Sequence, residues 1–587
     1  MAFAPRHALT ARSSSSAALL LSLPLALGGC GDDGAGTASD TGGSSVTATT
    51  AGTTAATTAG GETEGASETG VTTAGSEGGT TGTTGATTTE GATSTDPMTS
   101  GIVTTGDPSD SATDTDTEGA TTGAPVDECK VPEEELDGMA ECDQEAPPDS
   151  FNPAVQWTWT GEVDRWSIVT PLVANLTDDN QDGEIDLCDT PDVVVLAYPQ
   201  TSAPGYLYIL DGETGVPHFK IEDSVHWGCS PALGDIDDDG VPEIVAYRNG
   251  ALLAFEHDGQ KKWEKPASVN GLAHAIALAD VDNDGDVEIF VGNELIDHNG
   301  DLVATTGFAS ALSAGVLADL DSDGDQEIIL TNAAYHHDGS QYYSHQGDIN
   351  NFGYPQVANL DDDPEPEILI EAWDGISILE HDGAIKYLNE KPLPANPGDP
   401  WLRPSTVHDF DGDGEAEFAV STGTQYAVYE RDLSIIWTAP VIDASGDATG
   451  TAFDFLGDGI PEAMYGDEQN IHVFDGAGQT LFSEPRTSIT HIEYPVVADI
   501  DNDGPAEILI VSNSFNNNSQ STIKAIRDAE DRWIQARRIW NQHTYHVTNV
   551  REDGTIPQDE QPSWQDLNTY RTNAQIEGGS ICVPIPQ

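Results

Sequence analysis

The chain has 587 residues and carries 101 acidic against 21 basic side chains, which gives a formal net charge of −80 at pH 7. This balance argues against binding to a nucleic-acid backbone, which depends on clustered cations that displace counterions. It also argues against charge-driven adsorption on anionic lipids. The hydrophobic fraction of 37% is low against the about 45–50% of globular chains, so part of the chain is expected to lie outside any core.

Residues 1–29 are predicted to be a signal peptide. Arg6 and Arg12 precede a short apolar run at Ala17–Leu27 that ends in small residues and is too short for a mature membrane span. The segment Leu27–Cys30, Leu-Gly-Gly-Cys, resembles the lipobox of bacterial lipoproteins, which implies cleavage before Cys30 and lipidation of Cys30. An ordinary signal peptide followed by a chance cysteine is the alternative. We expect an exported protein at the bacterial outer membrane or cell surface, attached through its lipid anchor only.

Residues 30–126 consist mainly of Thr, Gly, Ser and Ala with scattered acids. Large apolar residues are almost missing, so burial cannot offset the entropy of ordering the segment. We predict a disordered linker there. Residues 127–165 then form a short lead-in whose cysteines are expected to staple it.

Five cysteines remain beyond Cys30, and an exported protein can keep disulfides. A bond between Cys129 and Cys142 would staple the lead-in, and one between Cys188 and Cys229 would link neighbouring repeats. The pairing cannot be deduced from sequence, and the odd number leaves one thiol over, which in these pairings is Cys582.

From about residue 167 one unit recurs eight times, consisting of an apolar strand, the loop Asp-x-Asp-x-Asp-Gly-x-x-Glu and a second apolar strand. Five copies are complete: Asp235/Asp237/Asp239/Glu243, Asp280/Asp282/Asp284/Glu288, Asp319/Asp321/Asp323/Glu327, Asp409/Asp411/Asp413/Glu417 and Asp499/Asp501/Asp503/Glu507. Three copies depart from the pattern: Asp178/Asn180/Asp182/Asp186, Asn359/Asp361/Asp363/Glu367 with Pro364 in place of glycine, and Asp454/Leu456/Asp458/Glu462.

The spacing of these acids suits Ca²⁺, which takes six to eight oxygens and needs a tightly coiled chain around it. Carboxylates at alternate positions can point to one centre, and glycine at the sixth position permits the sharp turn. The Glu at the ninth position can close the shell from the start of the next strand. The sequence therefore predicts several Ca²⁺ sites, formed by the five complete loops and the first one.

Two other interpretations of these loops exist. The EF-hand loop shares the first six positions, but it places its last Glu at position twelve and lies between helices. Asp and Gly clusters also form ordinary hairpin turns, and this alternative stays open for the loops at Asn359 and Asp454.

A second signature is Asp-Gly or Asn-Gly between two short strands, which indicates a hairpin. It follows most loops, as at Asp258-Gly259 and Asn299-Gly300. His257, His298, His337 and His381 recur at this turn and are interpreted as turn residues. Units of four short strands recurring at about 40–60 residues are typical of propeller blades. We predict an all-β fold, a β-propeller of eight four-stranded blades at residues 166–530, with seven blades as the alternative.

These loops and hairpins resemble the FG-GAP/VCBS repeat family, found in the integrin α head and in bacterial surface proteins. The resemblance implies an integrin-like propeller with Ca²⁺ in the loops between the first two strands of the blades. It also implies adhesion or ligand binding through the face opposite or beside these loops. Pro364 and Leu456 depart from the family pattern.

The C-terminal segment, residues 531–587, is basic and aromatic. The structural interpretation is that it packs on the acidic propeller and secures the last blade. The alternative is a ligand site in which Arg537, Arg538, Trp540 and His543 face an anion or a sugar.

Motifs for a serine nucleophile, a zinc protease or a phosphate loop are missing. The expected function is therefore non-enzymatic, namely a monomeric, calcium-stabilised surface lipoprotein that presents its propeller to an extracellular protein or glycan. The alternative is an exported propeller enzyme that acts on polysaccharide or performs a quinone-dependent oxidation.

Overall fold

The computed structural model describes residues 129–586 except for 133–134, 137–138, 200–203, 270–273, 308–313, 395–402, 444–447 and 514–519. The predicted signal peptide, Cys30 and the linker lie outside the described residues. Within the described residues, no helix is both long and apolar enough to cross a bilayer.

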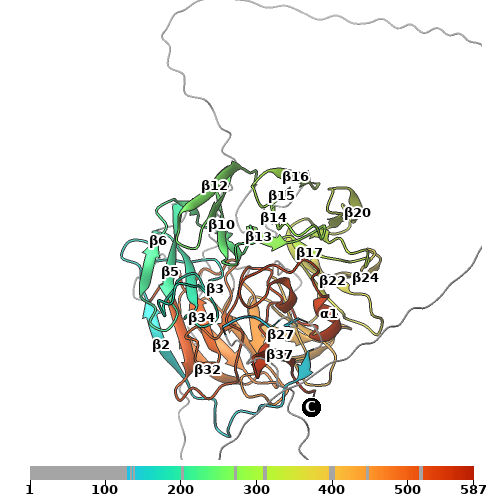
Figure 1. Ribbon diagram of the computed structural model, residues 1–587. Coiled ribbons are helices and arrows are strands. Elements are labelled where there is room, and N and C mark those ends of the chain that lie inside the picture. The colour runs from blue at the N-terminus through green and yellow to red at the C-terminus, as the bar shows by residue number, and fades with distance from the viewer. Residues whose placement is uncertain are drawn as a thin grey trace, which may run out of the picture. The chain divides into compact units, whose positions relative to one another are not determined.

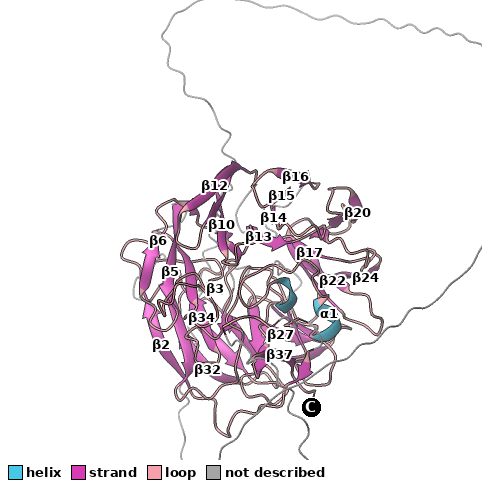
Figure 2. Cartoon of the chain, viewed as in Figure 1, coloured by secondary structure: helices cyan, strands magenta, loops and turns pink. Residues whose placement is uncertain are grey.

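Short antiparallel strands dominate the described chain, and the two short helices both lie in the C-terminal segment (Figure 2). Among the described residues, eight sheets each contain four blade strands, two of them with one additional short strand, and a ninth sheet of three strands lies outside the blades. This arrangement confirms the all-β fold and the eight-bladed propeller. The innermost strands of successive sheets contact each other, for example β9 with β13 and β13 with β17.

Each blade runs from its innermost strand to its outermost strand. Blades 1 to 4 comprise β3 (Leu172–Ala174), β4 (Asp192–Ala197), β5 (Pro204–Asp211) and β6 (Pro217–Lys220); β9 (Ala232–Gly234), β10 (Glu243–Arg248), β11 (Ala251–Phe255) and β12 (Lys261–Pro266); β13 (His274–Ala279), β14 (Glu288–Val291), β15 (Glu294–Ile296) and β16 (Leu302–Thr305); and β17 (Val316–Ala318), β18 (Glu327–Leu330), β19 (Ala333–Tyr335) and β20 (Gln341–Ser344). Two additional short strands, β7 (Val225–His226) and β8 (Cys229–Ser230), pair with β5 and β13.

Blades 5 to 7 follow the same order. They comprise β21 (Gly353–Ala358), β22 (Glu367–Ala372), β23 (Gly375–Glu380) and β24 (Ile385–Glu390); β25 (Thr406–His408), β26 (Glu417–Ser421), β27 (Gln425–Tyr429) and β28 (Ile435–Pro440); and β29 (Gly450–Phe453), β30 (Glu462–Gly466), β31 (Asn470–Phe474) and β32 (Thr480–Pro485).

Blade 8 is built from both ends of the domain. Its three inner strands are β33 (Val496–Ala498), β34 (Glu507–Val511) and β35 (Ile523–Asp528), and its outer strand is β2 (Pro153–Trp159) (Figure 1). Strand β2 belongs to the segment that was predicted to be a lead-in, before the predicted propeller at 166–530. Because β2 covers the free edge of β35, the ring closes through backbone hydrogen bonds.

The second strand of each blade is an apolar run that is buried on both faces, as the sequence pattern predicts. Every residue of β34, Glu507–Val511, is buried, and so is every residue of β26. Strands in radially packed sheets lie between two neighbours, which explains why their side chains do not alternate between apolar and polar. The four histidines of the hairpins all lie in the turns between third and outer strands, as predicted.

A β-bulge recurs between the third and the outer strand of every blade. One residue of the outer strand is left without a partner at this point, so that two residues oppose one. In blade 2 this residue is Lys262, because Ala254 pairs with Trp263 and Phe255 pairs with Lys261. The equivalent residues in blades 1 and 3 to 8 are His218, Val303, Tyr342, Lys386, Ile436, Leu481 and Gln156.

The C-terminal segment contacts the inner part of every blade. It pairs with β3 at Trp540 and with β25 at Tyr570 through backbone bonds of 2.9–3.0 Å. Other bonds join it to the remaining six blades: Leu233 N to Asn541 O, Leu278 N to Gln542, Gln326 to Glu560, Asn359 N to Asn568, Thr451 to Arg571 O and Asn573 to Val497 O. The segment therefore ties all blades together at the centre of the ring.

Two disulfides join the lead-in to distant parts of the domain. They link Cys129 to Cys188 and Cys142 to Cys582, and Cys229 is a buried free thiol. The pairings considered from the sequence, Cys129 with Cys142 and Cys188 with Cys229, are both wrong, because each cysteine of the lead-in lies against a different partner segment. Strand β1 (Ala140–Glu141) also pairs with β37 (Ser580–Val583), which in turn pairs with β36 (Gln575–Glu577).

Candidate metal centres

The acidic loops join the first and second strands of each blade, and seven of the eight share one backbone conformation. In loops 1, 2, 3, 4 and 8 the fourth residue is a non-glycine with a left-handed φ of 53–63°, and the glycine at the sixth position has a φ of 91–102°. Loops 6 and 7 have glycine with positive φ at both positions. This double left-handed turn coils the chain around a single centre, as a cation site requires.

The first Asp of these loops fixes the coil through the backbone. Its Oδ2 accepts a hydrogen bond from the N–H of the sixth residue at 2.8–3.1 Å in seven loops, which begin at Asp178, Asp235, Asp280, Asp319, Asp409, Asp454 and Asp499. The other oxygen, Oδ1, accepts a bond from the N–H of the fifth residue in five of these loops, whereas Oδ1 of Asp319 and of Asp499 has no hydrogen-bond partner among the described residues.

The acid that begins the second strand closes each loop. In blades 2 to 8 its Oε2 accepts a hydrogen bond from the N–H of the second loop residue, for example from Ile236 to Glu243 at 3.0 Å and from Phe410 to Glu417 at 2.7 Å. The ligand oxygens of Asp409, Asp411, Asp413 and Glu417 thereby come within 4.8 Å of one another. The sequence prediction that acids at positions one, three, five and nine converge is correct in geometry for this loop.

Ten of the twelve predicted ligands at the third and fifth positions lie at the solvent-exposed rim of their loops. Asn180, Asp182, Asp284 and Asp323 are all exposed, unlike the buried acids that close the loops. Other exposed acids at these positions are Asp237, Asp239, Asp282, Asp321, Asp413 and Asp503. The protein encloses the predicted ligand set only from the side of the strands, so the exposed side would have to be completed by water.

In Asn180, Asp182, Asp284 and Asp323, one side-chain oxygen accepts a hydrogen bond from the backbone of the same loop. The Oδ1 atom accepts a hydrogen bond from the N–H two residues further on, at 2.8 Å for Asn180, 3.0 Å for Asp182, 2.9 Å for Asp284 and 3.1 Å for Asp323. Short polar side chains cap exposed turns in this way with or without a metal. All four residues cap the turn at the rim, and their role as metal ligands stays a prediction.

The first loop closes differently from the expectation. The N–H of its second residue, Asp179, donates to Asp189 at 2.9 Å, whereas Asp186 accepts a bond from Cys188 N. Asp189 is buried and lies three residues after Asp186, so the ninth-position rule missed it. Its place at the twelfth position matches the spacing of the EF-hand Glu, which was the available signal.

Loop 5 lacks the shared turn. Its fourth and sixth residues, Asp362 and Pro364, do not have positive φ, because the proline ring holds φ near about −65°. Loop 7 keeps the turn through Gly457 and Gly459 but has Leu456 in place of a carboxylate. The departures at Pro364 and Leu456 thus change the backbone in one loop and only the ligand set in the other.

The closing acids are buried among like charges, which raises their pKa values. Burial, together with the carboxylates of Asp411 and Asp409, raises the pKa of Glu417 to about 9. Burial and the carboxylates of Asp282 and Asp280 raise the pKa of Glu288 to about 8. Burial beside Asp501 and Asp499 holds the pKa of Glu507 well above its usual value. A bound cation would remove this repulsion and restore the ionised forms.

In two blades a lysine ammonium reaches into the carboxylate cluster. Lys262 Nζ forms ion pairs with Asp237, with Glu243 Oε1 at 3.2 Å and with Glu256 Oε1 at 3.3 Å. Lys386 in blade 5 pairs in the same way with Asp361, with Glu367 Oε1 at 2.9 Å and with Glu380 Oε1 at 3.5 Å.

In blade 8 the equivalent oxygen of the closing Glu has no lysine partner in the described part of the chain. Glu507 is 0% exposed, and its Oε1 has no hydrogen-bond partner among the described residues, nor has Oδ1 of Asp499, which is 3% exposed. Gln156 of β2 donates to Asp501 Oδ2 at 2.7 Å, and Arg527 lies 3.6 Å from the same oxygen. Unpartnered buried carboxylate oxygens are costly, so this cluster fits a cation better than an empty space.

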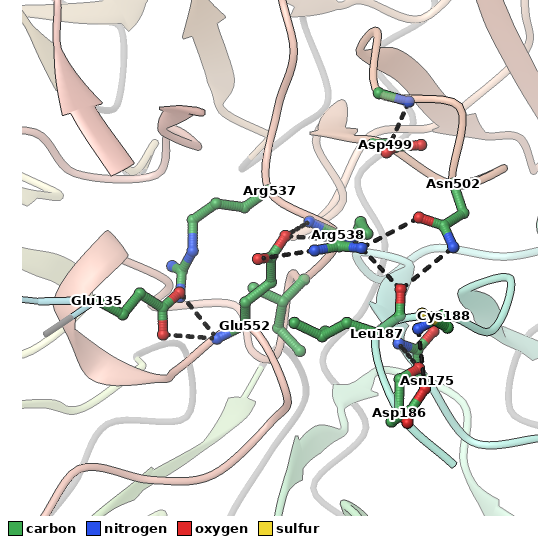
Figure 3. A network of polar contacts seen from close by, with 12 residues as sticks. Glu135, Asn175, Asp186, Leu187, Cys188, Asp499, Asn502, Arg537, Arg538 and Glu552 are labelled. Atoms are coloured by element: carbon green, nitrogen blue, oxygen red, sulfur yellow. Dashed lines mark hydrogen bonds and ion pairs between the residues drawn. The ribbon is translucent and has the colours of Figure 1, made fainter. Parts of the chain in front are cut away.

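The four residues considered as a ligand site in the C-terminal segment lie inside the molecule. Arg537, Trp540 and His543 are each 0% exposed. Arg537 is held by Glu135 at 3.2 Å, and Arg538 lies between Glu552, Asn502 and the carbonyl oxygen of Leu187 (Figure 3). This burial favours the structural interpretation, in which the basic residues join the lead-in, blade 1 and blade 8.

Comparison with known proteins identifies the repeat and the fold. Residues 235–291, from the loop of blade 2 to β14 of blade 3, match the family model of the FG-GAP-like repeat, which confirms the resemblance. The solved structure of the V. cholerae biofilm matrix protein Bap1 is similar with a TM-score of 0.67 and 20% identity, over 74% of this chain and 100% of that one. At this identity the likeness shows the fold alone.

A rhamnogalacturonan lyase from Bacillus licheniformis aligns with a TM-score of 0.46 and 16% identity, over 76% of this chain and 82% of its own. No curated protein matches the chain.

Proposed function

We propose that the protein is a calcium-stabilised lipoprotein of the cell surface that presents its propeller for adhesion to an extracellular protein or glycan. The observation that carries the calcium proposal is the shared coil of the acidic loops, which gathers three or four carboxylates around one centre. Oxygen-only donor sets of this kind suit Ca²⁺ and would not select Zn²⁺. The adhesive role is supported by the fold shared with a protein whose structure is described as that of a biofilm matrix protein.

The calcium proposal is tested by thermal unfolding of the full chain in Ca²⁺ and in chelator. A ligand of the folded state stabilises it by about 3–4 kcal/mol per site at 100 to 1,000 times its dissociation constant. We expect chelation to lower the melting temperature and restored Ca²⁺ to raise it again. An unchanged melting curve after verified removal of calcium would contradict the proposal.

The ligand face is proposed to lie opposite the acidic loops. Since the strands alternate in direction, the links between second and third strands and those between blades emerge on that face. Four large apolar side chains there are well exposed: Trp373 51%, Leu393 72%, Ile442 49% and Ile489 37%. Exposed apolar residues that gather on one face are typical of binding surfaces, and tryptophan often anchors them.

Binding is tested with glycan and protein arrays probed by the full chain with and without Ca²⁺. We expect saturable binding that falls at least tenfold for Trp373→Ala, whose exposed side chain can be removed without loss of stability. Lys265→Ala on the outer strand of blade 2 serves as the control. Equal binding by the wild type and Trp373→Ala would place the ligand elsewhere.

The lipid anchor is a separate proposal that depends on Cys30. Metabolic labelling with a fatty-acid analogue is expected to mark the wild-type protein and not Cys30→Ala, which would be released from the membrane fraction. Equal labelling of both proteins would contradict it.

A further inference from the structure

The lysines of blades 2 and 5 occupy the same structural position. Each stands at the bulge of the outer strand, and each contacts the third-position Asp, the closing Glu and an acid at the end of the third strand, Glu256 just after β11 or Glu380 at the end of β23. The repetition of one contact set in two blades shows that the bulge aims its residue at the centre of the acidic loop.

The other blades place different residues at the bulge. In blades 3, 6 and 7 the bulge residue is aliphatic: Val303, Ile436 or Leu481. Blade 2 and blade 3 have the same complete set of four carboxylates, so the bulge residue, Lys262 against Val303, is the main difference between their clusters.

The closing Glu shows what the lysine supplies. Its Oε1 is bound by Lys262 in blade 2 and by Lys386 in blade 5, whereas in blade 8 the buried Oε1 of Glu507 has no hydrogen-bond partner among the described residues. An ammonium group brings a fixed positive charge and three donors, so it satisfies carboxylates as a metal ion would. It also repels a second cation from the same centre.

We propose that Lys262 and Lys386 are built-in cations that take the place of Ca²⁺ in blades 2 and 5, and that in the loops with the shared coil the residue at the bulge decides whether the metal binds. This inference rests on the proposed calcium binding by the other loops. It removes the loop of Asp235, Asp237, Asp239 and Glu243 from the set expected to hold Ca²⁺.

The test is the number of Ca²⁺ ions per chain, measured by elemental analysis after equilibrium dialysis of the full-length protein. Lys262→Leu places the aliphatic residue of blade 7 at the bulge of blade 2 and is expected to gain one Ca²⁺. The gain should come with a rise in melting temperature on adding Ca²⁺ that exceeds the rise in the wild type.

Two variants serve as controls. Lys265→Leu, on the same strand, removes an exposed pair with Asp301 and is expected to leave the number unchanged. Lys386→Leu is expected to lower the melting temperature without gaining an ion, because loop 5 has Asn359 and Pro364 and lacks the coil. Conversely, Ile436→Lys should place an ammonium beside Glu417 and lose one Ca²⁺ from blade 6.

The outcomes separate this inference from the calcium proposal. A folded Lys262→Leu with the same Ca²⁺ number as the wild type would overturn the inference even if the wild type binds calcium. A wild type without Ca²⁺ would overturn the calcium proposal, and a gain from zero to one in Lys262→Leu would still support the role of the lysine.

If Lys262→Leu folds only when Ca²⁺ is present, the inference is supported. If it folds in neither condition, the count for Ile436→Lys decides: one ion fewer supports the inference and an unchanged count overturns it.

Discussion

Glu417 illustrates how a single residue couples the fold to its cation. The side chain is 1% exposed and holds the N–H of Phe410, yet it lies beside Asp409 and Asp411. In the absence of a cation the cluster can relieve its repulsion only by binding protons. Proton uptake and metal binding therefore compete for the same oxygens.

This competition predicts an unusual pH dependence for the chelated protein. The folded pKa of Glu417 is about 9 and that of Glu288 about 8, both above the ordinary value of 4.5. Between pH 4.5 and the folded pKa of each glutamate, the folded state therefore binds more protons than the unfolded state. The free energy of unfolding falls as the pH rises through this range. From pH 7 to pH 9 we expect a loss on the order of 1 kcal/mol for each such glutamate.

Saturating Ca²⁺ should largely abolish this loss, which chemical denaturation at each pH can measure. The window above pH 7 avoids buried histidines such as His491, whose pKa burial lowers to about 4. A chelated protein equally stable at pH 7 and pH 9 would contradict the assignment of these acids.

Cys229 supplies a second prediction at this scale. The thiol is buried on β8, and burial raises its pKa to about 12. Because the thiolate is the reactive form, we expect no labelling by a maleimide in the native Cys30→Ala protein at pH 8 and one label per chain after unfolding. Rapid labelling of the native protein would show that β8 opens.

At the scale of elements, the residues that bind neighbours within a blade were predictable from local spacing. The Asp-x-Asp-x-Asp-Gly loops, the Asp-Gly hairpins and the number of blades follow from a repeat that is visible along the chain. Asp189 lies outside the ninth-position rule but still within its own loop, so a search of the twelfth position would have found it. The bulge lysines and the disulfide partners were not predictable from local spacing, because each acts on a residue that tertiary structure brings near. Lys262, for example, lies 19 residues from Glu243 and meets it only across the blade.

The exposure of individual loop acids was also beyond the sequence pattern. Asp284 and Glu288 belong to one motif, yet Asp284 is exposed at the rim and Glu288 is buried at the start of β14. Spacing gives the order of the acids along the loop, whereas the packing of the neighbouring strands decides which of them are buried.

The burial of its side chains favours a structural role for the C-terminal segment over a role as a ligand site. Trp540 is 0% exposed, pairs with β3 and stacks on Tyr545 at a centroid distance of 4.4 Å. We expect Trp540→Ala to lower the free energy of unfolding by about 3–5 kcal/mol, as for other buried aromatic side chains. Trp373→Ala is the matched control and should change it by less than about 0.5 kcal/mol. A stable Trp540→Ala variant with lost ligand binding would restore the ligand-site interpretation of this segment.

At the scale of the whole molecule, the charge of −80 is distributed in a way that composition alone does not show. Many of the acids stand in eight loops at one face, where lysines, arginine and the proposed Ca²⁺ neutralise them locally. Several of the basic residues lie in the C-terminal segment, and Arg537 and Arg571 are fully buried there. The proposed Ca²⁺ binding would make the fold depend on cations at this face, while exposed apolar side chains lie at the opposite face.

The covalent link Cys142–Cys582 gives a prediction for the whole domain. It joins residues 440 positions apart, and closing so long a loop restricts the unfolded chain strongly. We expect Cys142→Ser with Cys582→Ser to lower the melting temperature by several degrees, corresponding to about 2–5 kcal/mol. Replacing the buried free thiol by Cys229→Ala is expected to cost less, which provides the comparison.

Strand β2 finally has a consequence for how the domain is made. Its backbone partners on β35 lie more than 350 residues later in the chain, as the bond from Asn152 N to Asp528 across 376 residues shows. The strand at the start of the ring must therefore wait for the last blade before it pairs with its neighbour. Such distant pairing slows folding, and during that wait the edge of β2 is open to the wrong partner. One late closure of the ring, made when the strands of blade 8 meet β2, is the folding step that this topology requires.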